Sequence, residues 1–133
     1  MIVLDSSAVL SVLLDEQQGD TVERLMAGHT TLCAPALLAY EVMNILSLHR
    51  RRTGDGALSD GALEQFSEWP WAFEAHCTLA SLQAVARLCA SHGLTAYDAS
   101  YLELAQRRAC PLVTFDQPLR RAAREQGIVV LPE

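Results

Sequence analysis

The sequence contains no lysine: all ten basic residues among its 133 residues are arginine. Without lysine the chain has no P-loop, no Schiff base and no lysine general base. Its four cysteines form no CxxC pair, and its four histidines show no paired spacing with each other or with the cysteines. These spacings argue against a zinc site and favour reduced, buried thiols in a cytoplasmic protein.

Long apolar runs are also missing. No stretch approaches the roughly 20 apolar residues of a membrane span. The apolar segment 1–14 carries Asp5 and lacks a basic start, so it makes a poor signal peptide. Disorder is disfavoured because 50% of the residues are apolar and only 20% are charged. We therefore expect a single domain over residues 1–133 that does not associate with membranes.

Positive charge is scarce, and the net charge of −6 disfavours binding of nucleic acid through bulk electrostatics. The arginines gather in three groups, Arg50–Arg52, Arg107–Arg108 and Arg120–Arg124. Cations are favourable near helix C-termini, which explains Arg107 and Arg108 as solvated helix ends. For the other two groups the sequence leaves a contact with phosphate open.

Short apolar runs alternate with helical patterns along the chain. We expect strands over 1–4, 30–33, 73–77, 111–115 and 128–131, and helices over 9–14, 18–27, 35–51, 59–68, 79–91, 96–108 and 117–126. This alternation predicts an α/β protein, a three-layer α/β/α fold with a central mostly parallel sheet.

Two aspartates directly follow expected strands: Asp5 follows the first strand and Asp116 follows the fourth. In open α/β sheets, ligands bind in the crevice at the carboxyl ends of the strands. The alternative for Asp5 is that it caps the next helix, although Ser6 and Ser7 already offer caps there.

Two further carboxylates lie on expected helices. Glu41 lies in the apolar stripe of the 35–51 helix, which runs on through Ile45, and Asn44 shares its face. Burial of Glu41 requires a partner, which is either an arginine or a metal ion. Asp98 lies three residues after Thr95, the expected N-cap of the next-to-last helix. An acidic side chain there can reach back to the cap, so capping alone would explain Asp98.

We expect these four carboxylates to converge. Carboxylates close together repel one another, and a divalent cation removes that cost. Oxygen ligands with few histidines favour Mg²⁺, with Mn²⁺ as the other candidate. Such a site suits phosphodiester hydrolysis, in which the metal activates water and stabilises the leaving oxygen.

Four segments resemble, in order, the motifs of PIN-domain ribonucleases of the VapC type, the toxins of bacterial toxin–antitoxin pairs. They are Val3–Ser7, Glu41–Leu46, Leu94–Ala99 and Leu112–Asp116, and they span nearly the whole chain. The resemblance implies a PIN-like fold and a magnesium-dependent endoribonuclease that cleaves RNA. It also implies a homodimer that a cognate VapB-type antitoxin inhibits.

The resemblance also assigns the candidate catalytic residues. The segment 52–77 matches no motif and leaves the choice of RNA open. Asp5, Asp98 and Asp116 are the expected metal ligands, with Glu41 as a further ligand or a water-orienting base. The motif hydroxyls fall on Ser7 and Thr114, and the helical asparagine falls on Asn44.

Two other functions compete with the nuclease. A dehalogenase-like phosphohydrolase would use Asp5 as its nucleophile. Ser7 stands where such an enzyme would carry a second aspartate, and the chain has no lysine. A non-catalytic PIN-like interaction module would keep the same fold and bind no metal.

Overall fold

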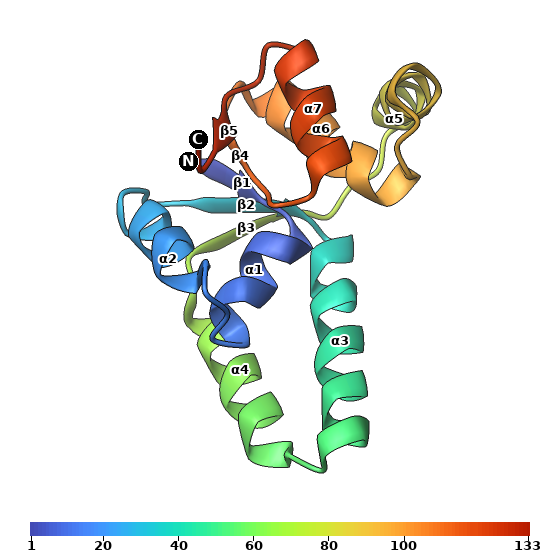
Figure 1. Ribbon diagram of the computed structural model, residues 1–133. Coiled ribbons are helices and arrows are strands. Elements are labelled where there is room, and N and C mark those ends of the chain that lie inside the picture. The colour runs from blue at the N-terminus through green and yellow to red at the C-terminus, as the bar shows by residue number, and fades with distance from the viewer.

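The computed structural model describes residues 1–133 (Figure 1). Its strands are β1 (Ile2–Leu4), β2 (Leu32–Pro35), β3 (Trp71–Glu74), β4 (Leu112–Val113) and β5 (Val130–Leu131). Its helices are α1 (Ser6–Leu13), α2 (Gly19–Ala27), α3 (Leu37–Thr53), α4 (Gly56–Glu68), α5 (Leu79–His92), α6 (Ala96–Arg108) and α7 (Gln117–Glu125). Every expected strand and helix is present, and all except the 96–108 helix have shifted boundaries.

The five strands form one sheet in the order β3-β2-β1-β4-β5, and every pairing is parallel. Helices α1 to α4 lie on one side of the sheet, α6 and α7 pack on the other, and α5 packs against α6 (Figure 1). The three-layer α/β/α prediction is confirmed, with a sheet that is parallel throughout. The chain changes faces between β1 and β4, so their carboxyl ends form the crevice in which such sheets bind ligands.

The central strand β1 is buried on both faces, and Ile2, Val3 and Leu4 are each 0% exposed. Helices on both sides of a parallel sheet explain why its strands read as continuous apolar runs. Leu32 of β2 and Leu112 of β4 extend the same core to either side. This rigid centre carries the strand ends described below.

The start and the buried face of α3 differ from expectation. Pro35 closes β2 rather than opening the helix, which begins at Leu37. The face turned to the core carries Leu38, Val42 and Leu46, whereas the expected stripe ran through Ile45, which is 37% exposed. Two overlapping stripes fit the helical period here, and the one that contains only apolar residues packs against the rest of the protein.

Gly93 ends α5 with a φ of 65°, the left-handed conformation that favours glycine after a helix. The four cysteines are free, but only Cys33 and Cys110 are buried. Cys77 is exposed because β3 ends at Glu74, which leaves Cys77 in the loop that follows. No helix is long and apolar enough to cross a membrane.

Candidate functional site

Asp5 and Asp116 follow the neighbouring strands β1 and β4 at the crevice. Asp5 is 4% exposed and caps α1, since its carboxylate accepts a hydrogen bond from the Ala8 N–H at 2.9 Å. The expectation that Ser6 or Ser7 caps this helix is therefore wrong. Asp116 caps α7 in the same way.

Two hydroxyl groups hold the Asp5 carboxylate. Ser7 Oγ donates to Oδ1 at 2.7 Å, and Thr114 Oγ1 donates to Oδ2 at 2.5 Å. The same two hydroxyl oxygens accept backbone N–H groups, Ser7 from Phe115 at 2.9 Å and Thr114 from Asp116 at 3.0 Å. The two predicted hydroxyl residues thus join the end of β1 to the end of β4.

Asp98 lies in the first turn of α6, after the N-cap Thr95. The Thr95 hydroxyl donates to Asp98 Oδ2 at 2.7 Å and accepts the Asp98 backbone N–H at 3.1 Å. The predicted cap is confirmed. It occupies one carboxylate oxygen, so Oδ1 of Asp98 makes no hydrogen bond within the protein. Capping and participation in a site are compatible for this residue.

Glu41 is half-buried on α3 and accepts a hydrogen bond from the hydroxyl of Tyr101 on α6. It forms no ion pair, so the arginine partner considered above is absent. Tyr101, which the sequence analysis did not single out, is only 1% exposed. The sequence signal that could have found it is its spacing, one helical turn after Asp98.

The acids Asp5, Glu41, Asp98 and Asp116 are called the acidic cluster below. No ion pair reaches any of them. Burial raises the pKa of Asp5 to about 6, and the charge of Asp116 adds to the rise, against the hydrogen bonds that Asp5 accepts. The cluster therefore carries negative charge that no protein cation offsets.

Glu41 and Asp98 also repel each other electrostatically. Burial raises the pKa of Glu41, and the charge of Asp98 raises it further, while the hydrogen bond from Tyr101 lowers it. Burial also raises the pKa of Tyr101, followed by the Glu41 contact and the charges of Asp5 and Asp98. The Tyr101 hydroxyl therefore lies within electrostatic reach of three of the four acids.

The cluster is open rather than closed around a ligand. No three His, Cys, Asp or Glu side chains lie close enough together to enclose a metal ion. Asn44 is exposed on α3, and no hydrogen bond joins it to the acids. The acids are therefore linked in pairs by their charges, Asp5 with Asp116 and Glu41 with Asp98. Ser7 and Thr114 hold Asp5.

Arg120, in the third arginine group, is buried and was not expected to be. Its guanidinium donates to the carbonyl oxygens of Thr114 and Pro132, each at 2.6 Å, and it is 7% exposed. Burial and these backbone partners make Arg120 a structural residue rather than a surface contact for phosphate. It ties the backbone of Thr114, next to the acidic cluster, to the segment after β5.

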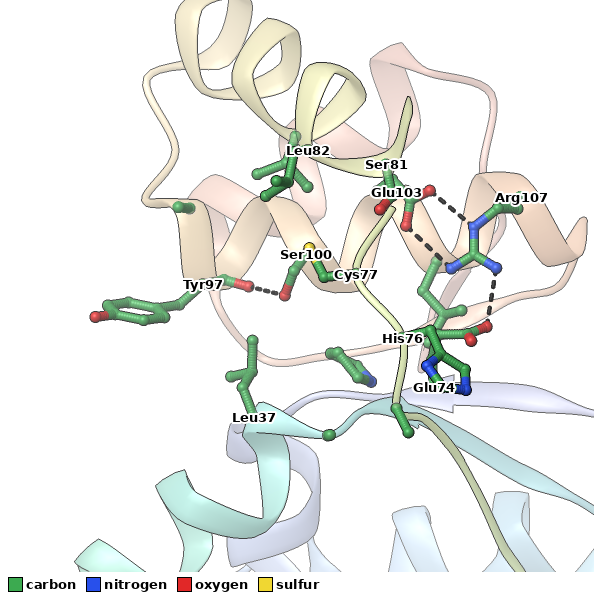
Figure 2. Close-up of a pocket in the computed structure, with 16 residues that line it drawn as sticks. Leu37, Glu74, His76, Cys77, Ser81, Leu82, Tyr97, Ser100, Glu103 and Arg107 are labelled. Carbon is green, nitrogen blue, oxygen red and sulfur yellow. Dashed lines mark hydrogen bonds and ion pairs between the residues drawn. The ribbon is translucent and has the colours of Figure 1, made fainter. Parts of the chain in front are cut away.

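A groove of about 330 Å³ lies between α5, α6, the segment after β3 and the start of α3 (Figure 2). Leu37, Leu82 and Tyr97 line it, and none of the four acids does. Arg107 borders it and bonds to Glu103 and Glu74 at 2.8 and 2.9 Å. The expected solvated helix end is thus an ion-pair network, which Arg108 joins through Glu74.

The sequence matches the model of the PIN domain family over residues 2–125. The chain belongs to the PIN domain family. This PIN domain is 32% identical to Ribonuclease VapC3 of Pyrobaculum aerophilum over 122 residues, which cover 89% of this chain and 91% of the relative. The family resemblance drawn from the four motifs is confirmed.

Solved structures share the fold of this PIN domain. PAE2754 from Pyrobaculum aerophilum is 24% identical with a TM-score of 0.74, over 98% of this chain and 88% of that one. VapC20 of Mycobacterium tuberculosis, a sarcin-ricin loop cleaving toxin, is 16% identical with a TM-score of 0.67, over 92% and 95%. VapBC2 from Rickettsia felis, bound to promoter DNA, is 14% identical with a TM-score of 0.68, over 98% and 97%.

Proposed function

We propose that this PIN domain is an endoribonuclease that hydrolyses RNA phosphodiester bonds at the acidic cluster. We further propose that it acts in the cytoplasm as the toxin of a VapBC-type toxin–antitoxin pair. The observation that carries the proposal is the cluster itself, four acids that are coupled by charge and make no ion pair. Its relative VapC3 is named a ribonuclease.

Mg²⁺, or Mn²⁺ in its place, is the proposed cofactor. The donors fit it, since Mg²⁺ prefers carboxylate oxygen and needs only one or two carboxylates beside its waters. An open cluster meets that demand although no three acids enclose a site. Asp5, Asp98, Asp116 and Glu41 would hold the ion. Once bound, it would lower the pKa of a water and stabilise the charge on the leaving oxygen.

The chain's own groups prepare this site. Hydroxyl groups fix the orientation of Asp5, whose two oxygens accept three hydrogen bonds. The free oxygens, Oδ1 of Asp98 and Oδ2 of Asp116, are left for a ligand or for water. An Asp5 that is 4% exposed and held by three donors is a poor nucleophile, which favours the nuclease over the dehalogenase-like phosphohydrolase.

Cleavage of a labelled RNA with and without Mg²⁺ tests the proposal. We expect cleavage with the metal, none in excess EDTA, and none from Asp98→Asn, which keeps the acceptor for Thr95. Asp20→Asn is the matched control, because Asp20 also lies in the first turn of a helix but is exposed. Full activity in EDTA, or an Asp98→Asn variant as active as the control, would contradict the proposal.

A cognate VapB-type antitoxin is the proposed inhibitor. This chain has the same fold as VapBC2 from Rickettsia felis and FitAcB from Neisseria gonorrhoeae. The test is co-purification with the product of an adjacent short reading frame, followed by the RNA assay. We expect that product to abolish cleavage at equimolar concentration, and cleavage that continues at saturation would contradict the assignment.

A homodimer is the last part of the proposal. Helix α5 packs against α6 on one side and stands outside the rest of the protein (Figure 1). Leu79 and Leu82 of this helix are 79% and 50% exposed, and only Leu88 is buried. A second copy would cover these apolar side chains. Light scattering should give twice the chain mass for the wild type and the single mass for Leu82→Glu.

A further inference from the structure

We propose that Tyr101 is a positioning residue of the nuclease site, whose buried hydroxyl fixes the carboxylate of Glu41. The inference rests on the proposed function and adds a residue to it. Tyr101 comes from α6, the helix that carries Asp98, and Glu41 comes from α3. Their contact is the hydrogen bond that joins these two helices at the acidic cluster.

The contact is specific on both sides. Tyr101 is 1% exposed, so packing fixes its ring and the position of its hydroxyl. The hydroxyl makes one hydrogen bond, to Oε2 of Glu41, and the Glu41 side chain makes no other within the protein. Glu41 has three rotatable side-chain bonds, and this single donor holds it in place.

The surroundings explain why Glu41 requires a donor. The charge of Asp98 acts on Glu41, and no arginine or histidine pairs with it. Without a donor, repulsion would favour rotamers that turn the carboxylate towards solvent. A cation would hold the carboxylate and also neutralise its charge. The neutral phenol hydroxyl holds the carboxylate inside the cluster and leaves its charge in place.

The hydrogen bond also makes the two carboxylate oxygens of Glu41 different from each other. Oε2 accepts from Tyr101, and Oε1 has no partner within the protein. Glu41 therefore presents one oriented oxygen, which suits a single bond to a metal ion or to a metal-bound water. Groups that orient a metal ligand in this way commonly contribute ~10–100-fold to affinity or activity.

The test is Tyr101→Phe, which removes the hydroxyl and keeps the buried ring. We expect kcat for RNA cleavage to fall ~10–100-fold with KM unchanged, and Mn²⁺ affinity of the RNA-free protein, measured by calorimetry, to weaken. Tyr40→Phe is the matched control. Tyr40 directly precedes Glu41, is 77% exposed, and its hydroxyl makes no hydrogen bond, so this variant should match the wild type.

A second comparison separates positioning from a structural role. If Tyr101 acts through Glu41, Tyr101→Phe should cause no further loss of kcat in a Glu41→Gln background. Losses that multiply, or a Tyr101→Phe variant with wild-type kcat and Mn²⁺ affinity, would overturn the inference alone. A wild type that neither binds Mn²⁺ nor cleaves RNA would overturn the proposed function and this inference with it.

Discussion

The Thr114 hydroxyl donates a hydrogen bond to Oδ2 of Asp5 at 2.5 Å, although 109 positions separate the two residues. Thr114 is 0% exposed, and its hydroxyl oxygen also accepts the backbone N–H of Asp116. One hydroxyl thus links two acids of the cluster, by its proton to one and by its oxygen to the other.

Thr114→Val keeps the shape of this side chain and removes both bonds. We expect the free energy of unfolding to fall by about 1–3 kcal/mol, because the Asp116 N–H and the Asp5 carboxylate each lose a partner away from water. Urea unfolding measures the change. Thr30→Val, at an exposed threonine without hydrogen bonds, should cost almost nothing. Equal stability of the two variants would show that the bond contributes little.

The buried Asp5 makes stability depend on pH. Its pKa rises from an ordinary 3.8 to about 6 in the folded protein, so the folded state holds a proton that the unfolded state releases. Protonated Asp5 therefore stabilises the folded state by up to about 3 kcal/mol. This contribution is complete below the unfolded-state pKa of 3.8 and is lost as the pH rises through the folded-state pKa of about 6. The difference in unfolding free energy between wild type and Asp5→Asn, both metal-free, should therefore decrease from about pH 4 to about pH 7. A constant difference would contradict the burial argument.

Glu41→Gln removes a charge that Asp98 repels, while its amide oxygen still accepts from Tyr101. We expect the metal-free variant to keep or gain thermal stability, its metal affinity to fall, and its rate of RNA cleavage to drop sharply but stay measurable. A buried ion pair broken by the same change would instead cost about 3–5 kcal/mol. Melting curves without metal and cleavage assays with it decide between the two. A large fall in melting temperature with cleavage preserved would remove Glu41 from the site.

Arg120→Met removes the donors from the carbonyl groups of Thr114 and Pro132. We expect a loss of about 1.5–3 kcal/mol in unfolding free energy, the range for hydrogen bonds to a charged group. Arg121→Met is the control in urea unfolding, since this neighbour is exposed and makes no hydrogen bond. Similar stability of both variants would refute a bracing role for Arg120.

The parallel fold could be predicted because its signals are local. The run 1–4 reads as a buried strand without reference to the rest of the chain, and the strand end then places Asp5 at the crevice. The same reasoning placed Asp116 after β4. Assigning the cap of α1 to a serine failed because Asp5, Ser6 and Ser7 are all good caps. The end of β1 in the folded sheet determines where α1 begins, and this places Asp5 at the N-cap.

Contacts between distant segments could not be predicted in this way. Tyr101 and Glu41 lie 60 positions apart on different helices, and no spacing rule relates them. The buried face of α3 followed from packing against the protein rather than from its period alone. Arg120 looked like any arginine of a charged helix, since its partners are backbone carbonyls that carry no sequence signal.

The position of β1 in the middle of the sheet has a consequence for the newly made chain. Its partner β2 leaves the ribosome early, but its other partner, β4, begins at Leu112. Until then Asp5 lacks Thr114, and Asp116 does not exist. A nascent chain that stops before β4 is therefore unable to assemble the acidic cluster, and the nuclease becomes competent only after Thr114 and Asp116 have been made.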